Sequence, residues 1–472
     1  MSLEDRLYPL LAAYQRLPDD VQHALGAAYR ALPVRFRLGK RFPEFQRLAR
    51  ECEGWDAEQI RDHQFRQLRQ VLNHAAAYCP FYQRRFAEAG FNPGRFHDPA
   101  DLIGCPTTTK ADLQQHLADM TSTEVPAKQR LYLTTGGSTG VPVGFHLQKG
   151  LSRPKEQAFL EAQWARAGWF PGARLAVIRG HVTTDRAAGR IAQYDATRGW
   201  LLLSSCHLTG ARLPEYLEAI EKFRPDALHA YPSAALQLAE FLERAGQSWR
   251  VPLKCVLAGS ERLNLPQKRL LERVFGCRVF RWYGHSERVV LAAEGRRSEL
   301  FHFWPAYGFV EFGEPDAEGF REVIATGFHN LAMPLIRYRT GDYVRLADPA
   351  RDPEPEFPWP VAAEVAGREQ EFLVSRTGRR ISLTAFNMHD AVFDGLYAVQ
   401  FWQPEPGVAE FRYVPSPAFH ASRLAAIEAG VRRKLGDDFE ITFRAVAETE
   451  KTARGKHRWL VSEVDEAQSS KL

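Results

Sequence analysis

The sequence lacks several patterns that identify common classes of protein. It has no uninterrupted run of about 18 apolar residues, so no membrane-spanning helix is expected. Its first positions contain Glu4 and Asp5 and no long apolar segment, which speaks against a signal or transit peptide. Its six cysteines form no Cys-x-x-Cys pair, which speaks against a zinc ribbon or a disulfide framework. We therefore expect a cytoplasmic protein with reduced thiols.

Basic clusters are also scarce. The net charge is +5 over 472 residues, without a dense Lys/Arg block, so no nucleic-acid partner is expected. A mild positive excess suits anionic small substrates. We interpret the segment 35–41 as a solvated basic loop, in preference to a contact with an anionic membrane surface. Its basic residues and neighbouring aromatics are Arg35, Arg37, Lys40, Arg41, Phe36 and Phe42.

Composition and periodicity indicate an α/β protein of two or three domains, because 472 residues exceed what one core usually organises. Helical spacing covers residues 5–48, with breaks at Pro18 and Pro33, and a longer helix ends at Cys79-Pro80. From Arg174, apolar runs alternate with amphipathic helices, as in a parallel sheet with crossover helices.

Beyond Phe301 the pattern becomes rich in strands, including one predicted over 335–338. The proline-rich stretch 348–360 predicts an exposed loop. A hairpin around Thr377-Gly378, two further strands, a helix and a last strand predict a small α+β domain. No internal repeat interrupts this pattern.

A run of small hydroxyl residues and glycines follows a β-capable segment at Leu131-Tyr-Leu133. Such a run lets backbone N–H and hydroxyl donors converge on an anion. Its spacing matches neither the P-loop nor the dinucleotide-binding glycine pattern, so a phosphate-binding loop and a polar surface loop both remain open. The residues are Thr134, Thr135, Gly136, Gly137, Ser138, Thr139 and Gly140.

Two polar segments follow predicted strands, where α/β sheets bind ligands. The first is Gly259-Ser260-Glu261, and the second comprises Tyr283, Gly284, His285, Ser286 and Glu287. The Glu287 carboxylate suits Mg²⁺ beside nucleotide phosphates, whereas a surface glutamate is the simpler alternative. Tyr283 offers a face for a base, although such a tyrosine often belongs to a core. Without a metal-ligand spacing, His207, His229 and His285 are expected in a core or a pocket wall.

Three later segments complete the candidates. A glycine-supported turn over 338–342 would place Asp342 as an acceptor for ribose hydroxyls, with an ordinary hairpin turn as the alternative. Gly367-Arg368 is either a hinge or a loop. Lys456, after a glycine in a basic turn, is either a solvated cation or one delivered to a transition state that gathers negative charge.

The order of these segments resembles the successive core motifs of the acyl-adenylate-forming superfamily of ligases. Residues 60–462 are similar to its phenylacetate-CoA ligase branch, especially to members found with capsular polysaccharide biosynthesis. The similar segments include Pro106-Thr-Thr-Thr-Lys110, Tyr231-Pro-Ser233 and Asn330 to Tyr338. The resemblance implies a large multi-subdomain N-terminal domain with parallel or mixed sheets over 1–369, with 1–60 as a helical lead-in. It also implies a small mobile C-terminal domain over 370–472.

By this resemblance, residues 135–142 would wrap the ATP phosphates and Tyr283 would stack on adenine. Glu287 would hold Mg²⁺, Asp342 and Arg368 would address the ribose, and Lys456 would act in adenylation. Gly259 to Glu261 and Gly284 to Ser286 would complete the nucleotide site. The acid pocket would contain His207, Tyr231, Ser233 and Trp282, and its aromatic residues suit an aryl or sugar-ring acid. Rotation near Gln370 would open the second half-reaction.

The implied function is ATP-dependent activation of a carboxylic acid as an acyl-adenylate, followed by acyl transfer to CoA, an amine or a hydroxyl. Polysaccharide or secondary-metabolite biosynthesis is the expected setting, and the sequence also allows a homodimer. Gly136, Val143 and Gln370 depart from the usual pattern. The alternatives are an adenylyltransferase that moves AMP to a hydroxyl compound and a non-catalytic binding protein of the same fold. Gly295 stands where some relatives have a cysteine, so zinc is not implied.

Overall fold

The structure is a computed structural model in which the chain forms two compact units. Unit 1 comprises Met1–Tyr132, Phe145–Pro171 and Phe280–Gly367, and unit 2 comprises Leu133–Gly144, Gly172–Val279 and Arg368–Leu472. The division of the chain into domains at residue 369 stays a prediction. The described residues are 7, 10–14, 16–135, 143–180, 190–208, 211–316, 319–348, 356–366, 372–386, 396–415, 419–450 and 458–464.

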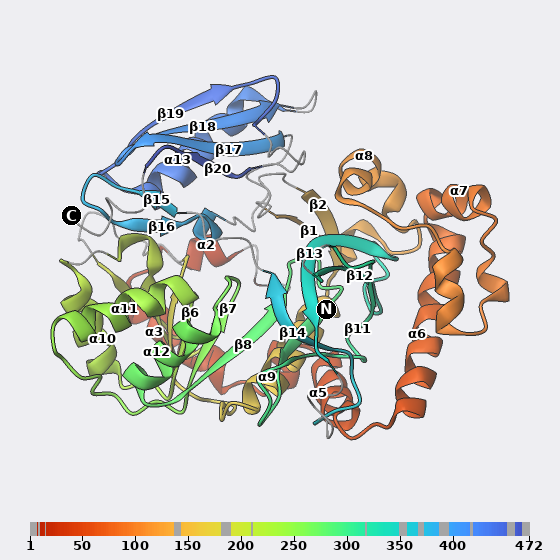
Figure 1. The fold of residues 1–472 in the computed structure, drawn as a ribbon, viewed down its shortest axis with the longest axis horizontal. Coiled ribbons are helices and arrows are strands. Elements are labelled where there is room, and N and C mark those ends of the chain that lie inside the picture. The colour runs from red at the N-terminus through yellow and green to blue at the C-terminus, as the bar shows by residue number, and fades with distance from the viewer. Residues whose placement is uncertain are drawn as a thin grey trace. The chain divides into compact units, whose positions relative to one another are not determined.

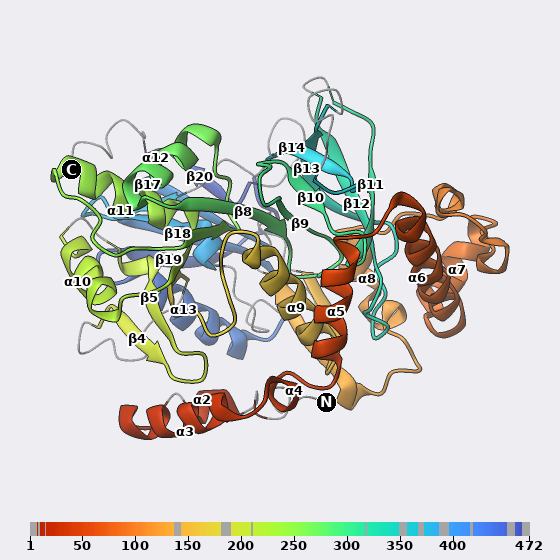
Figure 2. The same ribbon diagram turned by 90° about the horizontal axis from the view of Figure 1, so that it is seen from below.

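Helices dominate the first part of unit 1 (Figures 1 and 2). The α-helices are α2 (Leu11–Tyr14), α3 (Asp19–Ala31), α4 (Val34–Arg37), α5 (Arg41–Cys52), α6 (Ala57–Tyr78), α7 (Pro80–Glu88), α8 (Lys110–Met120) and α9 (Ser152–Ala165). Short 3-10 turns are η2 (Pro93–Arg95), η3 (Pro99–Gly104) and η4 (Ala127–Gln129). As predicted, α3 begins after Pro18. A capping box at Asp56 and Gln59 begins α6, and α7 begins at Pro80.

The sheet of unit 1 is antiparallel, in the order β11-β12-β13-β14-β10-β9-β8. Its strands are β8 (Arg278–Gly284), β9 (Leu291–Glu294), β10 (Phe301–Phe303), β11 (Gly308–Phe312), β12 (Arg321–Gly327), β13 (Tyr338–Leu346) and β14 (Val361–Ala366). The chain passes from unit 2 into unit 1 within β8. A hairpin of β1 (Arg130–Thr135) and β2 (Val143–Gln148) has segments in both units.

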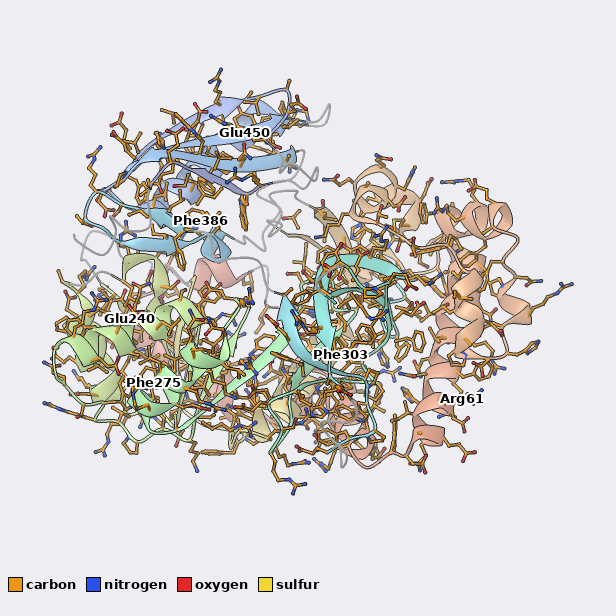
Figure 3. The ribbon with its side chains drawn as sticks, in the orientation of Figure 1. Arg61, Glu240, Phe275, Phe303, Phe386 and Glu450 are labelled. Carbon is orange, nitrogen blue, oxygen red and sulfur yellow. The ribbon has the colours of Figure 1, made fainter. Side chains whose placement is uncertain are left out.

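Unit 2 contains the predicted parallel sheet with crossover helices (Figure 1). The strand order is β7-β6-β3-β5-β4, and only the β4–β5 pair is antiparallel. The elements are β3 (Leu175–Arg179), β4 (Ala192–Asp195), β5 (Trp200–Ser204), η5 (Ser205–His207), α10 (Leu213–Phe223), β6 (Ala227–Ala230), α11 (Pro232–Arg244), β7 (Cys255–Gly259) and α12 (Leu265–Phe275). Phe275 lies in the apolar core of this sheet (Figure 3).

The C-terminal part of unit 2 is the expected α+β arrangement. The predicted hairpin is β15 (Phe372–Val374) with β16 (Arg380–Ser382), followed by η7 (Leu383–Phe386). A four-stranded sheet, β19-β18-β17-β20, packs on α13. Its elements are β17 (Leu396–Glu405), β18 (Val408–Pro415), α13 (Ala421–Leu435), β19 (Glu440–Ala445) and β20 (Leu460–Ser462). Phe386 lies in its core (Figure 3). The α/β fold class is thus confirmed.

Three local predictions were wrong. The segment 35–41 is a loop only over 38–40, because Val34–Arg37 forms α4 and Arg41 begins α5. Its residues Arg35, Lys40 and Arg41 are exposed as expected, but Phe42 is buried. The strand expected over 335–338 begins at Tyr338 instead. The turn expected over 338–342 lies inside β13 as a bulge: Arg339 pairs with Ile324 and Tyr343 with Glu322, so three residues face Val323 alone.

The described end of the proline-rich stretch is also not exposed. Phe357 and Trp359 are buried and stack on each other with ring centroids 4.4 Å apart. The Arg166 guanidinium lies over both rings at 4.6 and 5.1 Å, while its Nε donates to Glu53 at 2.9 Å. Prolines exclude regular structure from such a segment, but its aromatic residues still drive it into the core.

The cysteines are mostly buried, and burial changes the acidity of their thiols. All six cysteines are free, five are buried and Cys277 is half-buried. Burial raises the pKa of Cys52, Cys79 and Cys105 to about 12 each. Within the described ranges, no helix has both the length and the apolar character needed to cross a bilayer.

Substitution of Gly308 tests how closely β11 packs against Val289. A Cβ atom there would lie 2.0 Å from the Val289 carbonyl oxygen, so Gly308→Ala should lower the free energy of unfolding by about 1–3 kcal/mol through overpacking. Gly313, just beyond the other end of β11, is the matched control, because its added Cβ would meet nothing closer than 3.6 Å. Thermal unfolding of both variants measures the effect. Equal midpoints would contradict the close approach of Gly308 to Val289.

Candidate active site

Glu287 lies just beyond β8 in unit 1, and its carboxylate is buried among polar partners. The Tyr338 hydroxyl donates to Oε1 at 3.0 Å, and Oε2 lies 3.0 Å from His285 Nδ1. Tyr338 is fully buried at the start of β13, so the sheet fixes its hydroxyl against the carboxylate. The Glu287 carboxylate is therefore held in place by a partner at each of its two oxygens.

The charge of Glu287 depends on these neighbours. Burial alone would raise the pKa of its carboxyl, but the opposing interactions with His285 and the Lys110 charge hold the pKa at about 2. Burial and the same carboxylate raise the pKa of Tyr338 well above its usual value, so the phenol stays a donor. Glu287 is therefore a buried anion at neutral pH.

Asp342 is brought to the same part of unit 1 by the bulge in β13. Gly341 has φ 74°, and Thr340 accepts a hydrogen bond from the Asp342 backbone N–H at 3.1 Å. The Tyr283 hydroxyl donates to Asp342 Oδ2 at 2.9 Å. Burial and the Asp342 carboxylate raise the pKa of Tyr283 well above its usual value. Two tyrosine hydroxyls thus hold two carboxylates on neighbouring segments.

Lys110 joins this group through the segment that precedes α8. Thr108 pairs with Tyr338 as a β-bridge, its N–H donating to the Arg337 carbonyl at 3.1 Å and its carbonyl accepting from the Arg339 N–H at 2.8 Å. The next residue, Thr109, caps α8. Lys110 Nζ consequently lies 4.0 Å from the position of a Cβ on Gly341. The Lys110 charge is thus near enough to help lower the pKa of Glu287.

Backbone strain accompanies the predicted site residues. Among described non-glycine residues, positive φ occurs at Arg224 and at three positions adjacent to or within the predicted site: Ser260, Arg288 and Arg337. Arg337 is held by its Glu311 ion pair and by the carbonyl of Cys105 at 2.6 Å. Such strain persists only where surrounding contacts over-determine it, and it is frequent at functional sites.

A second polar group lies at the carboxyl ends of the parallel strands of unit 2. Arg179 ends β3, and its guanidinium donates to His229 Nε2 at 2.8 Å and to Ser260 Oγ at 2.5 Å. The same guanidinium lies 4.7 Å over the Tyr231 ring. Its partners among the described residues are thus neutral groups. Ligands bind at this edge of parallel sheets.

Other predicted pocket residues have local partners. The Ser233 N–H, in the first turn of α11, donates to Glu261 Oε2 at 2.9 Å, which satisfies a free donor of that helix. His207 Nδ1 lies 2.8 Å from Ser204 Oγ, just after β5. Trp282 lies in unit 1, where it packs against the aromatic core of α5 and α9. Trp282 is therefore in a different unit from Tyr231.

The structure groups the predicted residues by unit. Tyr283, Gly284, His285, Ser286, Glu287 and Asp342 lie in unit 1, and His207, Tyr231, Ser233, Gly259, Ser260 and Glu261 lie in unit 2. Thr134 and Thr135 end β1, and Thr134 is buried. The loop Gly136 to Gly140, Arg368 and Lys456 lie outside the described residues.

Sequence patterns missed four polar residues of these groups as site residues, namely Lys110, Tyr338, Thr340 and Arg179. Tyr338 and Thr340 stand inside the motif that ends in Asp342, so the motif itself was a usable signal. Lys110 and Arg179 are distant from their partners along the chain, and only the β-bridge and the strand order bring them there.

The unit 1 group fits a magnesium ion that is bound mostly through nucleotide phosphates. Mg²⁺ usually takes one or two carboxylate oxygens and completes its shell with water and phosphate. Glu287 provides an ionised carboxylate whose two oxygens each retain a further lone pair. No cluster of three or more His, Cys, Asp and Glu side chains within the described ranges could hold a metal alone. The single carboxylate of Glu287 therefore fits a Mg²⁺ whose other ligands are phosphate oxygens and water.

Comparison with solved structures shows which known fold the chain shares. The fold matches a crystal structure of 2-hydroxyisobutyryl-CoA ligase in complex with 2-HIB-AMP and CoA, with TM-score 0.54, 19% identity, and 88% of this chain and 93% of that chain covered. A structure of the same ligase in the postadenylation state gives TM-score 0.53 at 19% identity, with 88% and 92% covered. The chain therefore shares its fold with this CoA ligase.

Sequence comparison identifies the family. No family model matches the chain. Phenylacetate-coenzyme A ligase of Escherichia coli is 30% identical over 304 residues, which cover 61% of this chain and 68% of that protein. Protein CapK of Staphylococcus aureus is 21% identical over 459 residues, which cover 96% and 99%. The chain belongs to the phenylacetate-coenzyme A ligase family of AMP-forming acid ligases.

The pKa of Glu287 generates a pH prediction. Its folded pKa of about 2 lies below the ordinary value of 4.5, so its ionised form stabilises the fold above pH 4.5, and this stabilisation is lost as pH falls towards 2. In His285→Ala, burial should dominate and the pKa should rise. The acid limb of kcat/KM for ATP should move up by about one pH unit or more.

The pH profile of ligase activity checks this expectation. His97→Ala, at an exposed histidine before η3, is the control and should keep the wild-type profile. Superimposable acid limbs for His285→Ala and the wild type, in variants with equal thermal stability, would show that His285 does not keep Glu287 ionised.

Proposed function

We propose that this protein activates a carboxylic acid with ATP in the cytoplasm and then transfers the acyl group to coenzyme A. The acid carboxylate would attack the α-phosphorus of ATP, and pyrophosphate would leave with the electron pair of the broken P–O bond. The thiol sulfur of CoA would then attack the acyl carbon and displace AMP. Membership of the phenylacetate-coenzyme A ligase family supports both steps.

The observation that carries the proposal is the buried, ionised Glu287, which the Lys110 charge helps to keep ionised. Both Glu287 and Asp342 act on the hydroxyl of Tyr338. Glu287 would hold Mg²⁺, which when bound neutralises phosphate charge. Asp342, fixed by the Tyr283 hydroxyl, would accept hydrogen bonds from the ribose hydroxyls. Lys110 would add positive charge where the phosphates lie. A carboxylate is a poor electrophile, and this charge arrangement favours its conversion to a mixed anhydride.

Lys456 and the loop Gly136 to Gly140 are also proposed to act in adenylation. The ammonium of Lys456 would stabilise charge on the α-phosphate as the new P–O bond forms. Backbone N–H groups of the loop, with Ser138 and Thr139, would bind the terminal phosphates. By the family resemblance, Arg368 would contact the ribose and Tyr283 would stack on adenine. Withdrawal of Lys456 by rotation near Gln370 would permit the second step.

Arg179 is proposed to bind the acid. Its half-buried guanidinium has five N–H donors, and its described partners are neutral, so an oxygen-bearing group of the substrate would be a favourable further acceptor. Tyr231 would contribute a ring face, and Ser233 and His207 would line the pocket further along the same strand edge. These groups suit an aryl or sugar-ring acid with a polar substituent.

Acid-dependent exchange of labelled pyrophosphate into ATP tests the first half-reaction. An acid panel should reveal exchange, and Lys456→Ala should lower its rate by about 100-fold or more, as expected when a group that stabilises transition-state charge is removed. Absence of exchange with every acid, despite measurable ATP binding, would refute the ligase proposal. Covalent AMP on a hydroxyl compound without acyl transfer would instead identify an adenylyltransferase.

Arg179→Ala tests the acid pocket, using the acid that supports the fastest exchange. KM for the acid should rise about tenfold or more, while KM for ATP stays unchanged, because the loss of a charge-assisted hydrogen bond costs about 1.5–3 kcal/mol. Arg174→Ala is the matched control, since Arg174 precedes the opposite end of β3. An unchanged KM for the acid in Arg179→Ala would remove Arg179 from the pocket.

A further inference from the structure

Exposed large hydrophobic side chains are concentrated in the first residues of the chain. Eight of the exposed large hydrophobic residues in the described ranges precede residue 37, and four lie in all the rest. The eight are Leu7, Leu10, Leu17, Val21, Leu25, Leu32, Val34 and Phe36. We call residues 16–37, which include α3 and α4, the N-terminal arm. Single exposed apolar residues are ordinary on soluble proteins, whereas such a concentration marks an interaction site.

Burial along α3 is the reverse of the usual amphipathic pattern. The helix buries Gln22 and Gly26, while Val21 and Leu25 are 42% and 51% exposed. Positions 21, 25, 28 and 32 follow the spacing of one helical stripe, so Ala28 and Leu32 continue the exposed apolar face. Figure 2 shows α2 and α3 leading away from α5 through α4. The apolar stripe of α3 therefore faces solvent.

The charges beside this stripe have one sign. From Val21 to Pro43 the sequence contains no Asp or Glu, but five Lys and Arg residues: Arg30, Arg35, Arg37, Lys40 and Arg41. In α4, Phe36 is 55% exposed and the Arg35 guanidinium lies 4.9 Å from its ring centroid. The acidic residues Asp19 and Asp20 occupy the first turn of α3, at its other end.

We propose that the N-terminal arm binds the surface of an anionic lipid bilayer. The stripe of Val21, Leu25 and Leu32, with Phe36, would enter the boundary between headgroups and acyl chains, while the cations contact lipid phosphates. A second copy of the chain is a poorer occupant, because a two-fold contact would bring the same basic segment against itself. The arm lies on the membrane and does not cross it.

Vesicle flotation tests the proposal with the full-length protein. Vesicles of phosphatidylcholine with about 30% phosphatidylglycerol should bind the protein, and pure phosphatidylcholine should bind it several-fold less well. Raising the salt concentration should weaken binding to the anionic vesicles. Leu25→Ser with Phe36→Ser should reduce binding about tenfold or more, because each exposed apolar side chain contributes through its buried area. Arg35→Gln with Arg37→Gln should reduce only the part that depends on anionic lipid.

Matched control variants use exposed apolar residues outside the arm. Ile103→Ser and Leu265→Ser, at residues 80% and 47% exposed, should leave vesicle binding unchanged. Thermal unfolding confirms that each variant is folded, and pyrophosphate exchange reports separately on the ligase. Lack of binding to anionic vesicles, or equal loss in the control variants, would overturn the proposal. Sedimentation showing a dimer that Leu25→Ser and Phe36→Ser dissociate, without vesicle binding, would assign the face to self-association.

Discussion

The cost of burying the Glu287 charge governs the arrangement of the sheet in unit 1. A buried carboxylate is tolerated only when donors and opposite charge replace its hydration. The Tyr338 hydroxyl, His285 and Lys110 provide them from β13, from the same turn and from the start of α8. These three segments must therefore keep their places for the anion to exist, and the β-bridge at Thr108 is the contact that ties two of them together.

The local sequence pattern predicted most of the fold because apolar residues recur at clear helical or strand spacing. The helix over Ala57–Tyr78 and the strands of unit 2 follow from apolar spacing, proline positions and caps, which act within a few residues. Predictions failed where tertiary pairing decided the outcome. Glycine at 341 indicates a turn in isolation, but pairing with β12 turns the same backbone into a bulge. Prolines indicated an exposed loop, yet the Phe357 ring is buried against the Arg166 guanidinium.

The candidate site shows the same division between local and distant information. Tyr283, Glu287 and Asp342 were found as short motifs, and the structure joins Tyr283 to Asp342 through one hydrogen bond. Arg179 carries no motif and becomes visible only when parallel strand order places its guanidinium beside Tyr231. Residue type and spacing thus suggest what chemistry is present, whereas the donors and counter-charges that tune it depend on chain topology.

The shielding of the cysteines has a consequence for selectivity among nucleophiles. An acyl-adenylate, the proposed intermediate, would acylate any thiolate that reached it. Burial raises the pKa of Cys255 and of half-buried Cys277 to about 12, so on the order of 10⁻⁵ of each thiol is ionised at pH 7. Burial also raises the pKa of Cys206. The protein's own sulfur atoms would thereby be poor competitors for the activated acid, which would protect the enzyme from acylating itself.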